Sequence, residues 1–278
     1  MSLSLACLQR SAAMAAPERR ISAGRPVPDE NGVMMYDYGG SIGVVYNPKV
    51  VTAYGLQYHD SYRRTGDPQA RRNLINTANW LLEHAKEKGD GKCSLWEYGF
   101  KWGWYGGVEP PYTSALAQAE GVNVLLLAHE ITGRDRYLAE ARRAFGAFLV
   151  DYDDGGVASD EGRDSIFLQL LAKPGFQKTY VLNGHTNSLI YVWKYHQYTR
   201  DYRALIVFGK GVNWLTVDGN LQKYYTGDWS YYDQMGNRAK DNYHQGHIAQ
   251  LGKLYEITGE PVLKEYCDKF AACVRQGP

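Results

Sequence analysis

Residues 115–135 read ALAQAEGVNVLLLAHEITGRD, and this stretch decides which fold we expect. Apolar residues such as Val122 and Leu125 recur at three- and four-residue spacing, which predicts a helix. Gly133 then ends that helix, and the acidic Asp135 begins a second one, because glycine is the common stop signal and acids favour the first turn. The stretch therefore predicts two helices joined by a tight turn, which is a helical hairpin.

Turn sequences similar to that of this hairpin recur along the chain, at steps of about 60–67 residues. One such step holds two helices and a longer connection, and repeated hairpins of this kind curl into solenoids or close into α/α toroids. We therefore expect a mainly α protein, an α/α barrel (toroid) of helical hairpins, with a plain helical bundle as the alternative. The four copies of the turn are Thr65-Gly66-Asp67, Thr132-Gly133-Arg134-Asp135, Thr199-Arg200-Asp201 and Thr258-Gly259-Glu260.

The N-terminal part of the chain differs from the rest. Residues 1–28 are rich in Ala, Ser and Arg, and their apolar runs are short, so they predict a disordered leader and no convincing signal peptide. Residues 32–47 place glycines among alternating apolar positions, which predicts a short β-hairpin or an extended arm. Residues 29–278 are then expected to form a single α/α-barrel domain.

Composition excludes some classes of function. The chain has 278 residues with 31 basic and 30 acidic side chains, so no basic surface for nucleic acid is expected. No run approaches the roughly 18 apolar residues that a membrane-spanning helix needs, which predicts a soluble protein of unknown compartment. The four cysteines show no metal-binding spacing and are expected to be free thiols: Cys7, Cys93, Cys267 and Cys273.

Most of the aromatic residues carry a polar group, since there are 23 Tyr and 7 Trp against 7 Phe. Such side chains combine a flat apolar face with a polar edge, which suits the faces and hydroxyl rims of sugars. They are concentrated in residues 93–113, CSLWEYGFKWGWYGGVEPPYT, whose glycines and prolines exclude a regular helix. We interpret this segment as a sugar-binding platform, with a plug for the hydrophobic core as the alternative.

A second dense region, residues 224–251, reads YYTGDWSYYDQMGNRAKDNYHQGHIAQL. On a helix, His244 and His247 would share one face, as two metal ligands do. The H-E-x-x-H spacing and a third ligand are missing, so the sequence predicts no metal. Hydrogen bonding in a cleft is the favoured interpretation of the two histidines, and burial in the core is the alternative.

Five segments in series resemble the catalytic domain of the heparan-type D-glucuronyl C5-epimerases. The resemblance covers about residues 46–275 and implies an α/α-barrel enzyme that acts on an anionic, glucuronate-containing polysaccharide. The sequence shows no nicotinamide or pyridoxal signature, so no cofactor is expected. A homodimer is compatible with the resemblance. The segments are YNPKVVTAYGLQYHDSY (46–62), VEPPYTSALAQAEGVNVLLLAHEITG (108–133), YVLNGHTNSLIYVWKY (180–195), SYYDQ (230–234) and NYHQGHIAQL (242–251).

The resemblance also implies site residues. Tyr232 and Tyr243 fall on catalytic tyrosines of the family. A family glutamate that acts as acid or base is replaced by Ala172, and Lys173 replaces the tyrosine beside it. Judged by residue type, the candidates to take over the role of this glutamate are Lys173, Gln169, Glu97 and Glu109. The residues expected to bind substrate are Glu109, Tyr112, Gln118, Lys173, Asn183, Arg238, His244 and His247.

The chemistry of a uronate fits these residue types. Removal of the C5 proton leaves a carbanion conjugated with the carboxylate, so a cation such as Lys173 or Arg238 is expected to neutralise it. Epimerisation also needs a base and an acid on opposite ring faces. Tyrosine suits these roles if nearby positive charge, for example from His244 or Arg238, lowers its pKa.

Other functions stay open at this point. A polysaccharide lyase removes the same proton and then expels the 4-linked sugar, and the missing glutamate favours it. A glycoside hydrolase needs paired carboxylates, for which Asp228, Asp233 and Glu109 are candidates by type alone. A non-catalytic uronan-binding protein is the remaining alternative.

Overall fold

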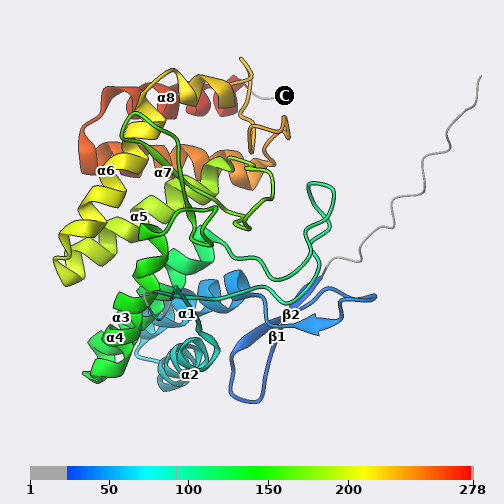
Figure 1. Cartoon of the computed structure of the whole chain (residues 1–278), viewed down its shortest axis with the longest axis vertical. Coiled ribbons are helices and arrows are strands. Elements are labelled where there is room, and N and C mark those ends of the chain that lie inside the picture. Colours follow the sequence, from blue (N-terminus) through cyan, green and yellow to red (C-terminus); the bar gives the residue numbers. More distant parts are fainter. Residues whose placement is uncertain (1–23, 90, 92, 277–278) are drawn as a thin grey trace, which may run out of the picture.

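The computed structural model describes residues 24–89, 91 and 93–276, and they form four helical hairpins with short strands between them (Figure 1). The fold is mainly helical, as the sequence predicts. The helices are α1 (Pro48–Thr65), α2 (Pro68–His84), α3 (Ala115–Thr132), α4 (Asp135–Phe145), α5 (Leu182–Thr199), α6 (Tyr202–Thr216), α7 (Asp241–Thr258) and α8 (Pro261–Gln276), with the short 3-10 helices η1 (Gly146–Leu149) and η2 (Asn220–Tyr224).

Each recurring Thr turn joins the two helices of one hairpin, which confirms this part of the prediction. In every copy the threonine hydroxyl donates to the carbonyl four residues earlier and accepts from the backbone N–H two residues later. The residue after the threonine is in the left-handed conformation, which releases the chain from the first helix. These residues are Gly66, Gly133, Arg200 and Gly259, with φ of 73°, 66°, 58° and 73°.

Arg200 is the exception among these four, because it carries a Cβ in a conformation that favours glycine. Its side chain is exposed. We expect Arg200→Gly to raise the free energy of unfolding by about 0.5–1 kcal/mol, since relief of the backbone strain outweighs the greater freedom of glycine in the unfolded chain. Urea denaturation would measure the change. Gly133→Ala, which adds a Cβ at the equivalent left-handed position, should lower the free energy of unfolding. A loss of stability in Arg200→Gly would contradict the interpretation.

The first helices of the hairpins pack side by side in the order α1, α3, α5, α7, and each second helix packs on its own partner. The array therefore curves as an arc of α/α hairpins (Figure 1). Helix α3 is buried around most of its circumference. Gly121 on this helix permits a close approach, because a Cβ there would lie 2.5 Å from an indole carbon of Trp96.

The strands form three small antiparallel sheets. The first orders β1 (Arg25–Pro28), β2 (Met34–Asp37) and β3 (Val44–Val45), so the predicted hairpin is a three-stranded sheet. Because β1 lies within the predicted leader, the boundary at residue 28 is placed too late, while residues 1–23 lie outside the described part. The others pair β4 (Lys86–Lys88) with β5 (Cys93–Leu95) and β6 (Ala158–Asp160) with β7 (Ile166–Leu168).

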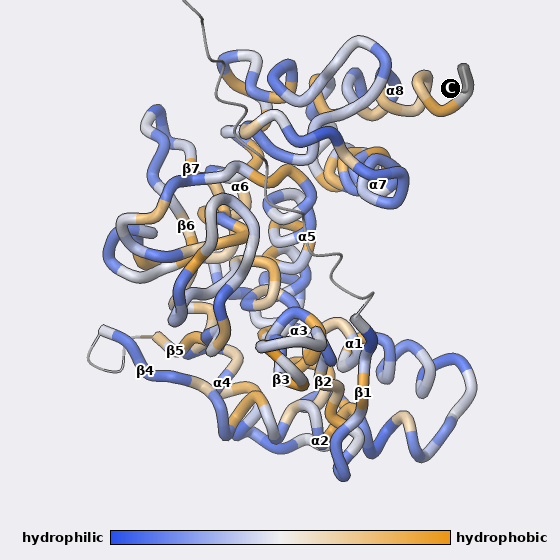
Figure 2. The backbone as a smooth tube through the Cα atoms, turned by 90° about the vertical axis from the view of Figure 1, so that its right-hand side faces the viewer, coloured by the Kyte–Doolittle hydropathy of each residue, from blue (hydrophilic) through white to orange (hydrophobic). Residues whose placement is uncertain are grey.

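The aromatic segment 93–113 begins in β5. Figure 2 shows hydrophilic β4 beside apolar β5, and β5 is buried. Trp96 continues into the core, where its indole N–H donates to the Leu81 carbonyl at 2.9 Å. Farther on, Tyr98 and Tyr112 stack with ring centroids 4.7 Å apart and form a separate cluster. The segment is thus a plug at its start and a wall of a pocket beyond it.

Candidate active site

A pocket of about 530 Å³ lies where the aromatic segment, the N-termini of α1 and α5, and helix α7 meet. Its wall is aromatic with interspersed amides and hydroxyls, which is the composition expected of a sugar site. The lining residues are Asn47, Lys49, Tyr98, Trp102, Trp104, Tyr105, Tyr112, Ser114, Leu116, Leu170, Leu171, Val181, Asn183, Asn187, Tyr232, Asn242, Tyr243, Gly246 and Gln250.

Tyr232 and Tyr243 lie together in this pocket. Their ring centroids are 4.7 Å apart at an angle of 55°. The backbone carbonyl of Tyr232 accepts from the Leu182 N–H at the start of α5, and Tyr243 belongs to α7. The start of α5, which is distant in sequence, therefore anchors Tyr232 beside Tyr243.

The pKa of Tyr232 is raised well above its ordinary value, and burial is the main cause. The nearby Tyr243 and Asp233 raise this pKa further through their charge interactions with Tyr232, as does hydrogen bonding with Tyr243. The expectation that positive charge lowers the pKa of this tyrosine is therefore wrong. Tyr232 stays protonated at neutral pH and can donate a proton.

Tyr105 and Asp233 join the aromatic segment to the segment before α7. The Tyr105 hydroxyl donates to the Asp233 carboxylate at 2.6 Å. The backbone N–H of Met235 and the side chain of Asn237 also donate to this fully buried carboxylate. Asp233 is thus occupied in holding Tyr105 against the pocket, so the structure gives no support to its candidacy as a hydrolytic acid.

Lys49 is the cation that sequence reasoning missed. Among the described residues that line the pocket it is the only charged side chain. Its ammonium lies 3.0 Å from the carboxylate of Glu120, which is buried. A charged residue in the first turn of α1 and an acid within the apolar α3 were the signals that could have indicated the pair.

Two predicted binding residues line the pocket, Tyr112 and Asn183. Within the described residues the Tyr112 hydroxyl and the Asn183 side-chain oxygen are buried without a hydrogen-bond partner. Buried polar atoms are normally paired, so a bound ligand or water would complete both groups. These two assignments agree with the geometry and stay predictions.

Other predicted binding residues lie elsewhere. Gln118 is fully buried, and its amide donates to the carbonyls of Ser94 and Ala144 at 2.7 and 2.9 Å. It braces β5 against the end of α4 and is not part of the pocket wall, which corrects its expected role. Glu109, Lys173 and Arg238 are also absent from the lining: Glu109 pairs with Lys101, the ammonium of Lys173 donates to the Glu109 carbonyl, and Arg238 pairs with Asp228 on the surface.

His244 and His247 are interior residues, which corrects their expected place in the cleft. Both are fully buried, and the Ser230 hydroxyl lies 2.7 and 2.9 Å from their Nδ1 atoms. His244 also stacks on Trp229. In the described part of the chain no cluster of three or more His, Cys, Asp or Glu side chains has a metal-binding arrangement.

The buried histidines make stability dependent on pH. Burial lowers the pKa of His185 and of His247 from 6.5 to about 3. Between about pH 6.5 and 3 the unfolded chain therefore binds protons that the folded chain does not. The free energy of unfolding should then fall with decreasing pH by about 1.4 kcal/mol per pH unit for each histidine.

Urea denaturation at pH 6 and pH 5 would measure this slope. His247→Gln should reduce the slope by about 1.4 kcal/mol per pH unit, the contribution of one histidine. An identical slope in the variant and the unchanged protein would contradict the buried neutral state of His247.

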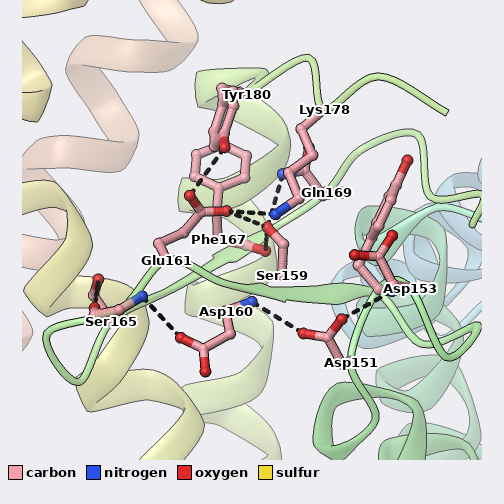
Figure 3. A network of polar contacts seen from close by, with 12 residues as sticks. Asp151, Asp153, Ser159, Asp160, Glu161, Ser165, Phe167, Gln169, Lys178 and Tyr180 are labelled. Carbon is pink, nitrogen blue, oxygen red and sulfur yellow. Dashed lines mark hydrogen bonds and ion pairs between the residues drawn. The ribbon is translucent and has the colours of Figure 1, made fainter. Parts of the chain in front are cut away.

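A polar network lies behind the chain that enters α5 (Figure 3). The Glu161 carboxylate accepts from the hydroxyls of Ser159 and Tyr180, and Lys178 lies 3.5 Å from it. Gln169, a predicted substitute for the family glutamate, is fully buried and donates to Ser159. The network fixes the segment before Val181 and Asn183, and Gln169 does not reach the pocket. Glu97, another predicted substitute, lines a separate small cavity instead.

The arc of α/α hairpins occurs in solved structures of carbohydrate-acting proteins. Unsaturated glucuronyl hydrolase from Streptococcus agalactiae aligns with a TM-score of 0.51 and 18% identity, over 80% of this chain and 56% of the other. That neighbour has the α/α toroid fold, so the predicted fold class is confirmed. Fold and pocket together define an α/α-toroid protein with an aromatic pocket.

Residues 90–272 match the family described as D-glucuronyl C5-epimerase C-terminus, and the chain belongs to this family. It is 30% identical over 264 residues to the uncharacterized protein MJ1128 of Methanocaldococcus jannaschii, covering 88% of this chain and 85% of that protein. It is 26% identical over 223 residues to the D-glucuronyl C5-epimerase of Caenorhabditis elegans, covering 69% of this chain but 33% of that enzyme. No helix among the described residues combines the length and apolarity that crossing a bilayer requires.

Proposed function

We propose that the protein is a C5-epimerase that converts D-glucuronate to L-iduronate units within a polysaccharide. The observation that carries this proposal is the contact between Tyr232 and Tyr243 inside one aromatic pocket. Epimerisation needs two proton-transfer groups that reach the same carbon, and this pair supplies them. Membership of the C5-epimerase family supports the same reaction.

The environment of Tyr232 divides the roles between the two phenols. Tyr243 acts as the base that takes the C5 proton, and the electron pair left on carbon is delocalised into the uronate carboxylate. Tyr232, which burial keeps protonated, returns a proton to the opposite ring face. Proton transfer from Tyr243 to Tyr232 then restores both groups, so the cycle is balanced and needs no external reagent.

Two alternatives make different use of the same pocket. A uronan lyase would begin with the same proton removal, and Ala172 at the position of the family's glutamate supports it. A glycoside hydrolase is less favoured, because none of the described lining residues is a carboxylate, whereas that reaction uses a pair of them.

Incubation of heparosan, a glucuronate polymer, in deuterated water tests the proposal. We expect deuterium at C5 and the appearance of iduronate, detected by NMR, without ultraviolet absorbance from an unsaturated uronate. Absorbance with chain cleavage would establish the lyase instead. No label in heparosan or in other uronans would refute both and favour the non-catalytic uronan-binding protein.

A further inference from the structure

Lys49 and Glu120 form an ion pair, and each of them lies in an environment that disfavours its charge. Lys49 lies in the first turn of α1, where the positive end of the helix dipole disfavours a cation. Glu120 lies in the middle of α3 with its side chain only 4% exposed, and burial raises its pKa. A charge so placed costs stability, and functional sites are where such costs persist.

The geometry leaves the ammonium of Lys49 available to the pocket. Its nitrogen lies 3.0 Å from Oε2 of Glu120, and the Thr52 hydroxyl donates to the same oxygen at 2.8 Å. Glu120 is behind the pocket wall, whereas Lys49 is one of the lining residues and about one-third exposed. Because an ammonium has three N–H donors and Glu120 occupies one, the remaining donors can reach a ligand.

The charges around the pair favour an anion. Lys194 is close enough to Glu120 to lower the pKa of that carboxyl group, while Asp60 in turn interacts with Lys194. The N-terminus of α1, whose cap Asn47 also lines the pocket, adds further positive potential. Glu120 is not among the described lining residues and Lys49 is, so an incoming carboxylate would meet the ammonium of Lys49 and the positive end of the α1 dipole.

We propose that Lys49 binds the carboxylate of the uronate unit, and that Glu120 and Thr52 are positioning residues that hold its ammonium. The identity of the ligand rests on the proposed function. Loss of the C5 proton increases the negative charge on the bound carboxylate, and a fixed ammonium stabilises this charge more strongly in the transition state than in the ground state. Lys49 thus contributes both to binding of the uronate and to the rate at which its C5 proton is removed.

Binding and exchange experiments on matched variants test this assignment. Affinity is measured for an unsulfated glucuronan and for its carboxyl-reduced counterpart, and C5 exchange is measured separately in deuterated water. In Lys49→Met we expect the preference for the carboxylate polymer to disappear and exchange to fall by about 100-fold or more, whereas Lys49→Arg should retain the preference. Lys264→Met on the surface of α8 is the control.

Glu120→Gln separates positioning from structural support. We expect exchange to fall about tenfold, through a higher KM, while the melting temperature is unchanged or raised because the buried carboxylate is removed. Glu265→Gln on α8 should change neither. A melting temperature that falls in Glu120→Gln with unchanged KM would indicate a structural ion pair and overturn the positioning role.

The outcomes distinguish this inference from the proposed function. If the unchanged protein exchanges C5 hydrogen and Lys49→Met does so equally well, the inference fails and the epimerase stands. If the unchanged protein binds the carboxylate polymer through Lys49 without exchange, the epimerase fails and the inference stands. Dependence on Lys49 for a sulfated, carboxyl-reduced polymer, and not for the uronan, would overturn the carboxylate assignment.

Discussion

Tyr243→Phe should abolish C5 exchange, with a loss of about 10²–10⁴-fold, because the phenol that removes the proton is replaced by a ring without a hydroxyl. The fold should be unaffected, since this ring is only partly buried in the cluster of Val181 and Tyr232. Deuterium incorporation into glucuronate, followed by NMR, measures the effect. Tyr202→Phe, at a highly exposed position of α6, is the matched control.

Tyr232→Phe should give a different result. Tyr243 remains able to remove the proton and return it to the same face, so the variant should label glucuronate with deuterium without forming iduronate. Undiminished epimerisation by either variant, or loss of folding in both, would contradict the assigned roles. Equal labelling of both epimers by Tyr232→Phe would show that another group donates the second proton.

Trp96→Ala should cause the largest loss of stability, about 3–5 kcal/mol in the free energy of unfolding. Trp96 is 1% exposed, packs on Gly121 of α3, and donates its indole N–H to the Leu81 carbonyl. Truncation would leave a cavity and an unpaired carbonyl between the first two hairpins. Urea denaturation would measure the change.

Trp104→Ala is the contrasting variant, because Trp104 is 45% exposed and lines the pocket. It should lose affinity for the polymer while its stability changes by less than about 1 kcal/mol. A small effect of Trp96→Ala on stability would contradict the role of the aromatic segment as a plug of the core.

The hairpins were predictable because their signals are local. The threonine turns need only a few consecutive residues, and the structure repeats the same hydrogen bonds at Thr65, Thr132, Thr199 and Thr258. Strand β1 was missed because its backbone pairing with β2 leaves little trace in the sequence RPVP.

The candidate site was predictable only where a residue type and a family motif coincided, as for Tyr232 and Tyr243. Burial could not be inferred from motifs: His244 and Gln118 have the polar chemistry of a site, yet their partners are backbone carbonyls of distant elements. Lys49 was missed for the opposite reason, because its partner Glu120 is 71 residues away by number and only the fold brings the two charges together.

A structure of the protein with a bound glucuronate oligosaccharide tests the central claim most directly. We expect the C5 carbon of one unit to lie between the hydroxyls of Tyr232 and Tyr243, within about 3–3.5 Å of Tyr243, as proton transfer requires. An oligosaccharide bound in the same pocket with C5 turned away from both phenols, or bound at another surface, would contradict the account.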